Sequence, residues 1–461
     1  MRLSYRILAI VTACIGYSSQ ALAQVNESNS TDSVSINFGC TNSTSNAQQR
    51  AETTNTVVRL DNRLSALQVE ANKRKDLPPS SDAEVEAILK LEQDIFNVKS
   101  QLALALSRQD CQTATRLPSE SLRGATEKAA VYVEVPLVYL TDRGRTADAD
   151  AANFYGSEFR NDGLEIGTVR VILPLSPERA SRPLLKTWKQ VVTPKQPRDF
   201  IVQNIHPTSV SANIQATLAN QITTGGTKRV LLFIHGFNVS FVEATVRGAQ
   251  LARDLDFEGS VIIYSWPSVG SLLNYSRDED SGRMAKQHLK QIIASLSANT
   301  TVDAVTVLAH SMGARITVDA LRELAETKHA SSKINNLILA APDINTYEFE
   351  RFLAPVIKDS FSFKTTIYMS SNDLPLKISR KLHDYPRLGD PEIYRYLQKG
   401  IDIIDTSKGS PMRRSWGHSY VWDNSTVMND IGNLINLTTP IDQRGLAAAV
   451  GPTGIPYWIL E

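Results

Sequence analysis

The sequence predicts an α/β protein in which a mostly parallel sheet with helices on both faces is preceded by an antiparallel α-helical hairpin. From residue 229 onward, short β-branched and apolar runs alternate with longer amphipathic runs. This alternation is typical of parallel strands that are connected by helices. Between residues 45 and 111, by contrast, apolar residues recur at intervals of three and four on either side of a Pro-Pro break, which indicates two helices.

Length and composition limit the possible classes of protein. The 461 residues exceed one ordinary domain, and 42% hydrophobic with 21% charged residues are typical of a globular protein with a sizeable core. A formal net charge of +1 gives no basis for binding nucleic acid. We therefore expect one large domain with a smaller addition, and no nucleic-acid partner.

Residues 1–23 are predicted to be a secretory signal peptide. Arg2 and Arg6 precede an apolar stretch, and Ala21-Leu22-Ala23 provides a cleavage site. The apolar stretch is shorter than the about 20 residues that span a bilayer. Lipid attachment at Cys14 is a weaker alternative, because Arg6 lies too close to leave a good hydrophobic region. We expect a secreted or periplasmic protein that is cleaved near Ala23.

A helical hairpin is predicted for residues 45–111, after a flexible segment at 24–44 that is rich in Ser, Thr and Asn. Two runs with coiled-coil-like apolar seams are separated by a break at 76–81. Cys40 and Cys111 flank the runs, so an antiparallel hairpin would bring them side by side, and an exported protein permits a disulfide worth about 4 kcal/mol. The hairpin could be a solvated spacer, a lid, or an arm for self-association or for a protein partner.

Residues 112–130 are expected to be a linker and residues 131–440 the α/β domain. Its expected strands are Val131–Leu140, Leu164–Leu173, Asp199–His206, Arg229–Ile234, Ser260–Ser265, Val302–Leu308, Asn335–Ala340, Lys364–Met369 and Ile401–Asp405. Its expected helices are Phe241–Asp254, Asn274–Leu296, one after Ser311, one around Tyr347–Ile357 and one around Leu374–Leu382. The tail 441–461 is apolar for a chain end, so we expect it to pack on a surface of this protein or of a partner.

The stretch Thr301–Glu326 combines a strand, a sharp turn and a helix, with a serine at the apex. An apolar run leads into Ala309-His310-Ser311-Met312-Gly313, and apolar residues then recur at helical spacing. Such a turn lifts a serine hydroxyl clear of the sheet and aims the first amides of the helix at a developing oxyanion. We therefore predict that Ser311 is a nucleophile, with Ala309 replacing the first glycine of the usual G-x-S-x-G pattern.

The groups that would assist Ser311 are expected beyond the carboxyl ends of the strands, where ligands bind in such sheets. The strand Arg229–Ile234 is followed by His235-Gly236-Phe237-Asn238, a turn whose glycine lets a backbone amide approach the serine. We assign the oxyanion hole to the N–H groups of Phe237 and Met312. By itself, the same turn could be an ordinary tight turn.

Elimination among the seven histidines leaves His418 as the base. His383 falls in a helical stretch, where a surface position is the more ordinary interpretation, and His310 would point away from the neighbouring serine. His418 lies in an irregular segment, Trp416–Tyr420, that follows the last strand and can reach over the sheet.

The carboxylate that would orient the imidazole has two leading candidates. Asp343 follows the strand Asn335–Ala340, and Asp373 follows the strand Lys364–Met369, so both emerge at the same edge of the sheet. Either could instead be the N-cap of the next helix, which is a frequent use of Asp. Asp402 and Asp405, near the last strand, are weaker candidates.

Several stretches resemble α/β hydrolases, and among them a bacterial esterase/lipase-like family of poorly defined function. The matching stretches, spread over about two thirds of the chain, are Val138–Arg143, Phe233–Asn238, Ser265–Ser268, His310–Gly313, Ala341–Ile344, Ser370–Asp373 and Gly417–Tyr420. The resemblance implies a Ser-His-Asp hydrolase on Ser311, His418 and Asp373, because the later strand usually carries the acid in this fold.

We predict an exported serine hydrolase that cleaves small-molecule or lipid carboxylic esters through an acyl-enzyme, without a metal or organic cofactor. A peptidase or amidase on the same triad is one alternative, and a catalytically inactive, partner-binding envelope protein is another. Tyr264, Trp266 and Tyr275 are expected to line or border the acyl pocket, although aromatic residues there could equally belong to the core.

Overall fold

The computed structural model describes residues 132–148, 151, 153–174, 190–192, 200–208, 214–222, 227–269, 275–326, 333–391, 399–408 and 418–461, with scattered positions between 58 and 94. The scattered positions are all helical, and Leu60 and Leu91 are buried. The predicted signal peptide, the linker 112–130, Cys40 and Cys111 lie outside the described residues. The hairpin, its disulfide and the export of the chain therefore stay predictions.

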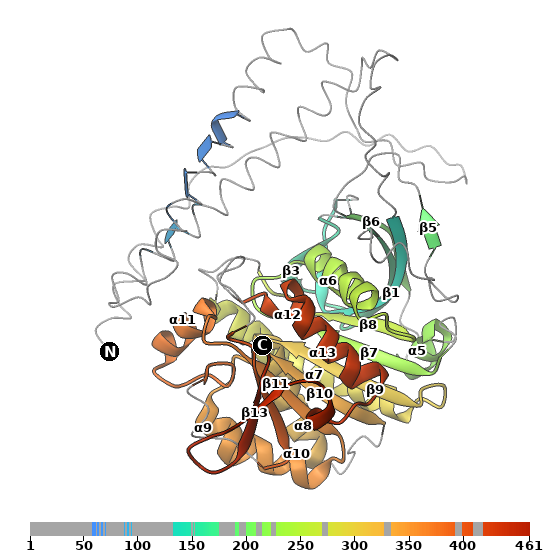
Figure 1. Cartoon of the computed structure of the whole chain (residues 1–461). Coiled ribbons are helices and arrows are strands. Elements are labelled where there is room, and N and C mark those ends of the chain that lie inside the picture. The colour runs from blue at the N-terminus through green and yellow to red at the C-terminus, as the bar shows by residue number, and fades with distance from the viewer. Residues whose placement is uncertain are drawn as a thin grey trace, which may run out of the picture.

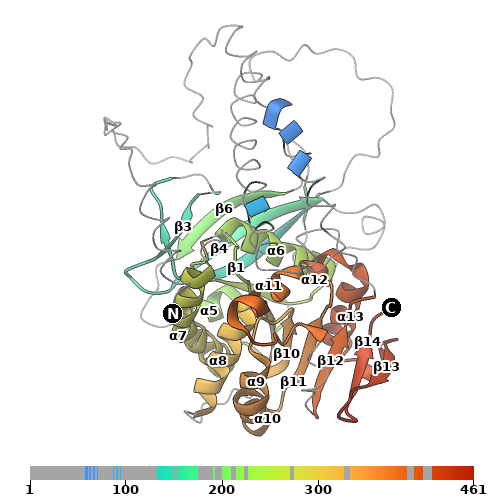
Figure 2. The same cartoon turned by 90° about the vertical axis from the view of Figure 1, so that its left-hand side faces the viewer.

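A sheet of twelve strands runs through the described part of the chain, in the order β13-β14-β12-β11-β10-β9-β7-β8-β1-β4-β6, with β5 paired to β1. Every neighbouring pair from β14 to β1 is parallel, and the outer strands β13, β4, β6 and β5 pair antiparallel. Figure 2 shows β6 and β4 at one end of this sheet and β13 with β14 at the other. The predicted mostly parallel α/β architecture is confirmed.

The strands of this sheet are β1 (Tyr132–Thr141), β4 (Glu165–Pro174), β5 (Gln190–Val192), β6 (Ile201–Thr208), β7 (Arg229–Ile234), β8 (Ser260–Ser265), β9 (Ala304–His310), β10 (Ile334–Ala340), β11 (Lys364–Met369), β12 (Ile401–Asp405), β13 (Ala447–Val450) and β14 (Pro456–Ile459). A separate two-stranded ribbon pairs β2 (Arg143–Arg145) with β3 (Tyr155–Phe159). The helices are α5 (Ile214–Ile222), α6 (Phe241–Asp254), α7 (Tyr275–Ala298), α8 (Met312–Glu326), α9 (Thr346–Glu348), α10 (Ala354–Ser360), α11 (Leu374–His383), α12 (Tyr420–Asp423) and α13 (Ser425–Asn436).

Helices cover both faces of the sheet, and each face has its own hydrophobic core (Figure 1). Strand β7 shows how one strand serves both, because successive side chains of a strand point to opposite faces. Val230, Leu232 and Ile234 pack with α5, α7 and α8 on one face. Leu231 and Phe233 pack with α6 and α13 on the other. Burial on both faces explains why the central strands are continuous apolar runs rather than alternating ones.

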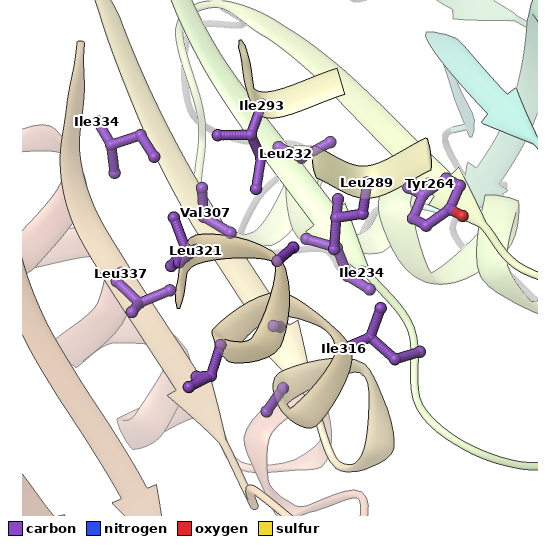
Figure 3. Packing of buried hydrophobic residues seen from close by; sticks show 14 of the residues in the cluster. Leu232, Ile234, Tyr264, Leu289, Ile293, Val307, Ile316, Leu321, Ile334 and Leu337 are labelled. Atoms are coloured by element: carbon purple, nitrogen blue, oxygen red, sulfur yellow. The ribbon is translucent and has the colours of Figure 1, made fainter. Parts of the chain in front are cut away.

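The core beneath α7 and α8 interlocks side chains from elements that are far apart in the sequence. Figure 3 shows Leu289 and Ile293 of α7 packed among residues of β7 and of the elements next to it. Tyr264 lies in the same layer and is fully buried. Since α8 follows directly on β9, this packing fixes where the turn at Ser311 lies.

From β7 onward, the expected elements through β12 are present, and β7, α6, β8, β11 and β12 have the expected bounds. The helix expected around Tyr347–Ile357 is divided into α9, a π-helical turn at Phe349–Leu353, and α10. Pro355 accounts for the irregular turn, because proline has no N–H to donate to the preceding turn of the helix. None of the described helices is long and apolar enough to cross a membrane.

Helix α13 was not expected, although its sequence carries a helical signal. Asn424 is the N-cap, and its side chain accepts a hydrogen bond from the N–H of Thr426 at 2.8 Å. Val427, Ile431 and Leu434 recur at intervals of four and three and are buried. A conventional cap followed by an amphipathic run would have predicted this helix.

The C-terminal segment packs on the protein itself. Strand β14 pairs in parallel with β12, and β13 folds back antiparallel on β14. The buried guanidinium of Arg444 donates from Nε to Oδ1 of Asp430 at 2.8 Å and from Nη2 to the hydroxyl of Tyr368 at 3.2 Å. Residues 441–461 are therefore built into the sheet edge and are tied to α13 and β11.

Replacing Arg444 by Lys is expected to lower the free energy of unfolding by about 2 kcal/mol. A lysine keeps the charge but cannot reproduce the paired hydrogen bonds to Asp430 or the bond to Tyr368. Guanidinium unfolding of the two proteins measures the difference. Equal unfolding midpoints and slopes would show that this buried pair does not anchor the C-terminal segment.

Candidate active site

Ser311 lies at the turn between β9 and α8, in a conformation that non-glycine residues rarely adopt. Its φ is 53°, and its side chain is buried at the carboxyl edge of the sheet. The N–H of Ser311 donates to the carbonyl of Ala340 at 3.0 Å, and its carbonyl accepts from the N–H of Asp343 at 3.2 Å. The left-handed conformation is thus held by hydrogen bonds from the neighbouring strand end, as a nucleophile elbow requires.

The turns after β7 and β9 approach so closely that two positions have no room for a side chain. A Cβ at Gly313 would lie 2.3 Å from the carbonyl oxygen of His235, and a Cβ at Gly236 would lie 2.8 Å from Cβ of Ser311. Because β7 and β9 are paired neighbours, with Ile234 opposite Ala309, the two turns begin in register. The glycines therefore permit the contact between the turn Gly236–Val239, which we call the oxyanion turn, and the elbow.

The structure brings Asp373 and His418 together. Oδ2 of Asp373 is 2.7 Å from Nδ1 of His418, and the carboxylate is fully buried. The other oxygen, Oδ1, accepts from the N–H of Leu376 at 3.1 Å, which makes Asp373 the N-cap of α11 as well. Burial raises the pKa of Asp373, and the charge of and hydrogen bond from His418 oppose that rise. Asp373 therefore serves both as the N-cap of α11 and as the partner of the imidazole, two roles that the sequence analysis treated as alternatives.

His418 lies beside the elbow. The ring of His310, which precedes Ser311, is 4.6 Å from the ring of His418 between centroids. Nε2 of His310 is 3.2 Å from the carbonyl oxygen of His418, and the ring of Trp422 packs edge-on with the ring of His310 at 5.0 Å between centroids. His310 thus supports the segment that carries His418, a role that the sequence analysis did not foresee. Burial lowers the pKa of His310 well below its usual value, so its ring is neutral.

Asp343, the other candidate acid, is engaged elsewhere. Its carboxylate accepts from the hydroxyl of Tyr275 at 2.5 Å and from Oγ of Ser379 at 2.7 Å. Two guanidinium groups face it, with Nε of Arg387 at 3.3 Å and Nη2 of Arg315 at 3.8 Å. Burial alone would raise the pKa of Asp343, but Arg315 and Arg387 outweigh it and lower the pKa. The geometry makes Asp343 the centre of a buried ionic network.

The N–H groups assigned to the oxyanion hole belong to the two turns that meet. Phe237 is in the oxyanion turn, and Met312 is the first residue of α8. Within the residues that the structure describes, neither N–H donates to a protein acceptor. Backbone donors of this kind, one of them at a helix N-terminus, are suited to bind an anionic oxygen.

The remaining histidines of the carboxyl edge have other partners. In α11, Nδ1 of His383 is 2.8 Å from the carbonyl oxygen of Ser379, and Nε2 is 2.9 Å from Oε1 of Glu279. His383 therefore links α11 to α7 rather than lying free on the surface. His235 stacks on Trp266 with ring centroids 5.1 Å apart, and burial with the nearby charge of Arg143 lowers its pKa to about 3.

Two of the three aromatic residues that were expected either at the acyl pocket or in the core belong to the core. Tyr264 and Trp266 are fully buried, the first with its hydroxyl bonded to the carbonyl of Ala285 at 2.8 Å and the second with Nε1 bonded to the carbonyl of His235 at 2.8 Å. Tyr275 is partly buried and packs against Phe237, with ring centroids 5.2 Å apart. Only Tyr275 therefore borders the candidate site.

Sequence reasoning did not single out Asp278, which is fully buried in the first turn of α7 and contacts the oxyanion turn. Its neighbours in sequence are charged and polar, so no pattern separates it from a solvated helix start.

A cavity lined by Arg229, Thr306 and Asn336 lies at the amino ends of the strands, at the edge opposite Ser311, and takes no part in the candidate site.

Residues 210–436 match a family described as an alpha/beta hydrolase of unknown function (DUF900). No curated protein matches the chain. The solved structures that are similar include the RedJ thioesterase of the prodiginine pathway in Streptomyces coelicolor, at 12% identity over 45% of this chain and 91% of that chain, with a TM-score of 0.28.

Two further similar structures are esterases. An inhibited esterase B from Lactobacillus rhamnosis is 12% identical over 75% of this chain and 97% of that chain, with a TM-score of 0.30. A fungal esterase from Rhizomucor miehei is 10% identical over 60% of this chain and 80% of that chain, with a TM-score of 0.29. At these TM-scores the structural likenesses carry no functional argument, which leaves the family match and the geometry of the site.

Replacing Asp343 by Asn is expected to lower the free energy of unfolding by about 3 kcal/mol at neutral pH, because Arg387 and Arg315 lose a buried counter-charge. The folded-state pKa of Asp343 is lowered, so its carboxylate stabilises the fold above an unfolded pKa of about 3.9. That contribution is lost as the pH falls through the folded pKa. Guanidinium unfolding of both proteins should be measured from neutral pH down to about pH 3. The difference between their free energies of unfolding should become smaller as the pH falls. A difference that does not change with pH would contradict this role.

Proposed function

Residues 210–436 belong to an α/β-hydrolase family, and on that premise we propose that the protein is an exported serine hydrolase that cleaves carboxylic esters with Ser311, His418 and Asp373. The observation that carries the proposal is the 2.7 Å contact between Oδ2 of Asp373 and Nδ1 of His418, beside an elbow serine with φ of 53°. A buried carboxylate on one imidazole nitrogen leaves the other nitrogen, Nε2, to act as the base.

In the proposed first half-reaction, Nε2 of His418 removes the proton from Oγ of Ser311 as the oxygen attacks the ester carbonyl. The carbonyl oxygen becomes an oxyanion that the N–H groups of Phe237 and Met312 stabilise. The tetrahedral intermediate collapses, the bond to the alcohol oxygen breaks, and the protonated His418 donates its proton to that leaving group. The product is an acyl-enzyme on Ser311 and a free alcohol.

In the second half-reaction, His418 removes a proton from a water molecule that attacks the acyl carbonyl. The new tetrahedral intermediate expels Oγ of Ser311, which recovers its proton from His418, and the carboxylic acid leaves. Asp373 holds Nδ1–H throughout and stabilises the imidazolium that forms twice in each cycle. Its full burial strengthens that interaction, because water does not screen it.

Esters are proposed over amides because an alcohol oxygen leaves a tetrahedral intermediate more readily than an amine does, which places the smaller demand on His418. Export follows from the predicted signal peptide at 1–23. A peptidase or amidase on the same triad is the alternative outcome of the substrate test below.

A fluorophosphonate probe is expected to label the wild-type protein covalently at Ser311, and the Ser311→Ala variant is expected to remain unlabelled and inactive while still folded. Mass spectrometry of the adduct locates the site, and circular dichroism checks the fold of the variant. Wild-type protein that resists labelling would instead support an inactive, partner-binding scaffold. On the labelled enzyme, a panel of p-nitrophenyl esters against peptide p-nitroanilides should show higher kcat/KM for the esters, and the reverse order would identify a peptidase.

Replacing Asp373 by Asn is expected to lower kcat by about 10³- to 10⁴-fold with little change in stability. Asparagine is as good an N-cap as aspartate, so the hydrogen bond from the N–H of Leu376 can survive. Its amide N–H₂ would face Nδ1 of His418 and favour the tautomer that cannot accept the serine proton.

The Asp343→Asn variant is the matched control, with turnover counted per fluorophosphonate-reactive site. Its kcat should fall less than about tenfold, because Asp343 holds Tyr275, Arg315 and Arg387 rather than the imidazole. If Asp343→Asn abolished turnover while Asp373→Asn were harmless, the assignment of the acid would be wrong.

A further inference from the structure

Three buried polar side chains outside the proposed triad converge on the oxyanion turn Gly236–Val239. We propose that Arg143, Ser268 and Asp278 are positioning residues, which hold the N–H of Phe237 where it stabilises the oxyanion that forms on attack by Ser311. This inference rests on the proposed function and adds to it the groups that orient the oxyanion hole. Arg143 is the first residue of β2, Ser268 lies in the segment after β8, and Asp278 lies in the first turn of α7.

Arg143 is a buried cation that is bound by neutral groups. Its side chain is fully buried, and Nη2 donates to the carbonyl oxygen of Val239 at 2.6 Å. Nη1 donates to the carbonyl oxygens of Ser268 at 2.9 Å and of Gly156 at 3.1 Å, and Nε donates to Oγ of Ser265 at 3.0 Å. Burial lowers the pKa of Arg143 to about 10, so it stays charged at neutral pH.

Burying a guanidinium whose hydrogen bonds go to carbonyl and hydroxyl oxygens costs stability that an apolar side chain would not cost. Arg444 donates directly to the carboxylate of Asp430, whereas the carboxylates near Arg143, Asp278 among them, attract it without a direct hydrogen bond. The planar fork of Arg143 reaches three separate chain segments at once, which a lysine or an apolar residue cannot do. A costly residue that joins those segments beside the candidate site points to a positioning role.

Asp278 and Ser268 hold the same turn from the side of α7. The carboxylate of Asp278 accepts from Oγ of Ser268 at 2.5 Å, from the N–H of Val269 at 2.8 Å and from the N–H of Asn238 at 3.4 Å. Oγ of Ser268 in turn accepts from the N–H of Val239 at 3.2 Å. Two consecutive amides of the oxyanion turn are therefore bound by one connected pair of side chains.

These bonds restrain the backbone on both sides of Phe237. Before it, the carbonyl oxygen of Gly236 accepts from Nδ1 of His235 at 2.8 Å. After it, Asn238 has a φ of 58°, a left-handed conformation that Asn adopts more readily than most residues, and Asp278 binds its N–H. Farther on, Arg143 binds the carbonyl of Val239. The N–H of Phe237, which has no protein acceptor among the described residues, is thus left free in a turn whose flanks are fixed.

A donor held in this way costs no reorganisation when charge develops on the substrate, and this preorganisation is the source of its catalytic effect. Loosening the turn should therefore weaken binding of the transition state more than binding of the substrate. If the three residues only closed the junction of β2, β8 and α7, their replacement would lower stability but would leave the ratio of transition-state binding to substrate binding unchanged.

The experiment uses the full-length enzyme and its Arg143→Lys and Ser268→Ala variants, with Arg444→Lys as the matched control for a buried arginine. Active sites are first counted by complete reaction with a fluorophosphonate. For each protein, kcat and KM are then measured on one p-nitrophenyl ester, together with Ki of a trifluoromethyl ketone. Oγ of Ser311 adds reversibly to the carbonyl carbon of the ketone. The ketone oxygen then becomes the anion that occupies the oxyanion hole.

For Arg143→Lys, we expect kcat per active site to fall about 10- to 100-fold, KM to change by less than about threefold, and Ki of the ketone to rise by the factor lost in kcat/KM. Ser268→Ala removes the acceptor of the Val239 N–H. It should also lower kcat per active site and raise Ki of the ketone, both by a smaller factor than Arg143→Lys. Arg444→Lys should lower stability while leaving kcat per site and Ki unchanged.

The inference is overturned if wild-type protein labels and turns over normally but kcat per site and Ki are unchanged in both Arg143→Lys and Ser268→Ala. If Arg143→Lys does not fold, Ser268→Ala decides by the same two measurements, since its change is confined to one hydroxyl. Wild-type protein that neither labels nor hydrolyses any ester or anilide would remove the proposed function, and this inference with it.

Discussion

The candidate site depends on the contact between two turns that leave adjacent parallel strands. β7 and β9 are paired in register, so the turns that follow them meet directly above the sheet. At Gly313 and Gly236 the approach is closer than any Cβ allows, and Ser311 between them adopts a left-handed conformation. Because the contact is largely backbone against backbone, it fixes the hydroxyl, the start of α8 and the oxyanion turn relative to one another. Every other part of the proposed chemistry is arranged around this contact.

The buried charges of the domain differ in their partners: some form closed ionic pairs that stabilise the fold, and others beside Ser311 do not. Arg444 with Asp430 forms a closed ionic pair at the sheet edge, which anchors the C-terminal strands. At the carboxyl edge, Asp343 is likewise paired with Arg315 and Arg387, but Asp373 meets an imidazole and the hydrogen bonds of Arg143 go to neutral oxygens. The arrangements of Asp373 and Arg143 are less favourable for stability than closed ionic pairs or apolar packing. Their concentration beside Ser311 is what a site that trades stability for preorganised electrostatics would contain.

The pattern of residues predicted most of the architecture because each signal was local. A buried parallel strand is an apolar run whatever its neighbours, so the bounds of β7, β8, β11 and β12 could be read directly. The elbow at Ser311 was predicted for the same reason, since strand, turn and helix are consecutive there. For Tyr264 and Trp266 the sequence left pocket and core as alternatives, because a buried aromatic residue and one that lines a pocket have the same sequence signature; both are buried in the core.

The sequence by itself determined the order of strands and helices, the serine at the sharp turn, and a short set of histidines and carboxylates at one edge of the sheet. Only the tertiary structure decided which of them meet. His418 and Asp373 are 45 residues apart, and the contact of Arg143 with Val239 spans 96 residues, so each depends on how β2, β7, β11 and the segment before α12 pack together. Periodicity reports which face of an element is buried, but not which distant side chain it is buried against.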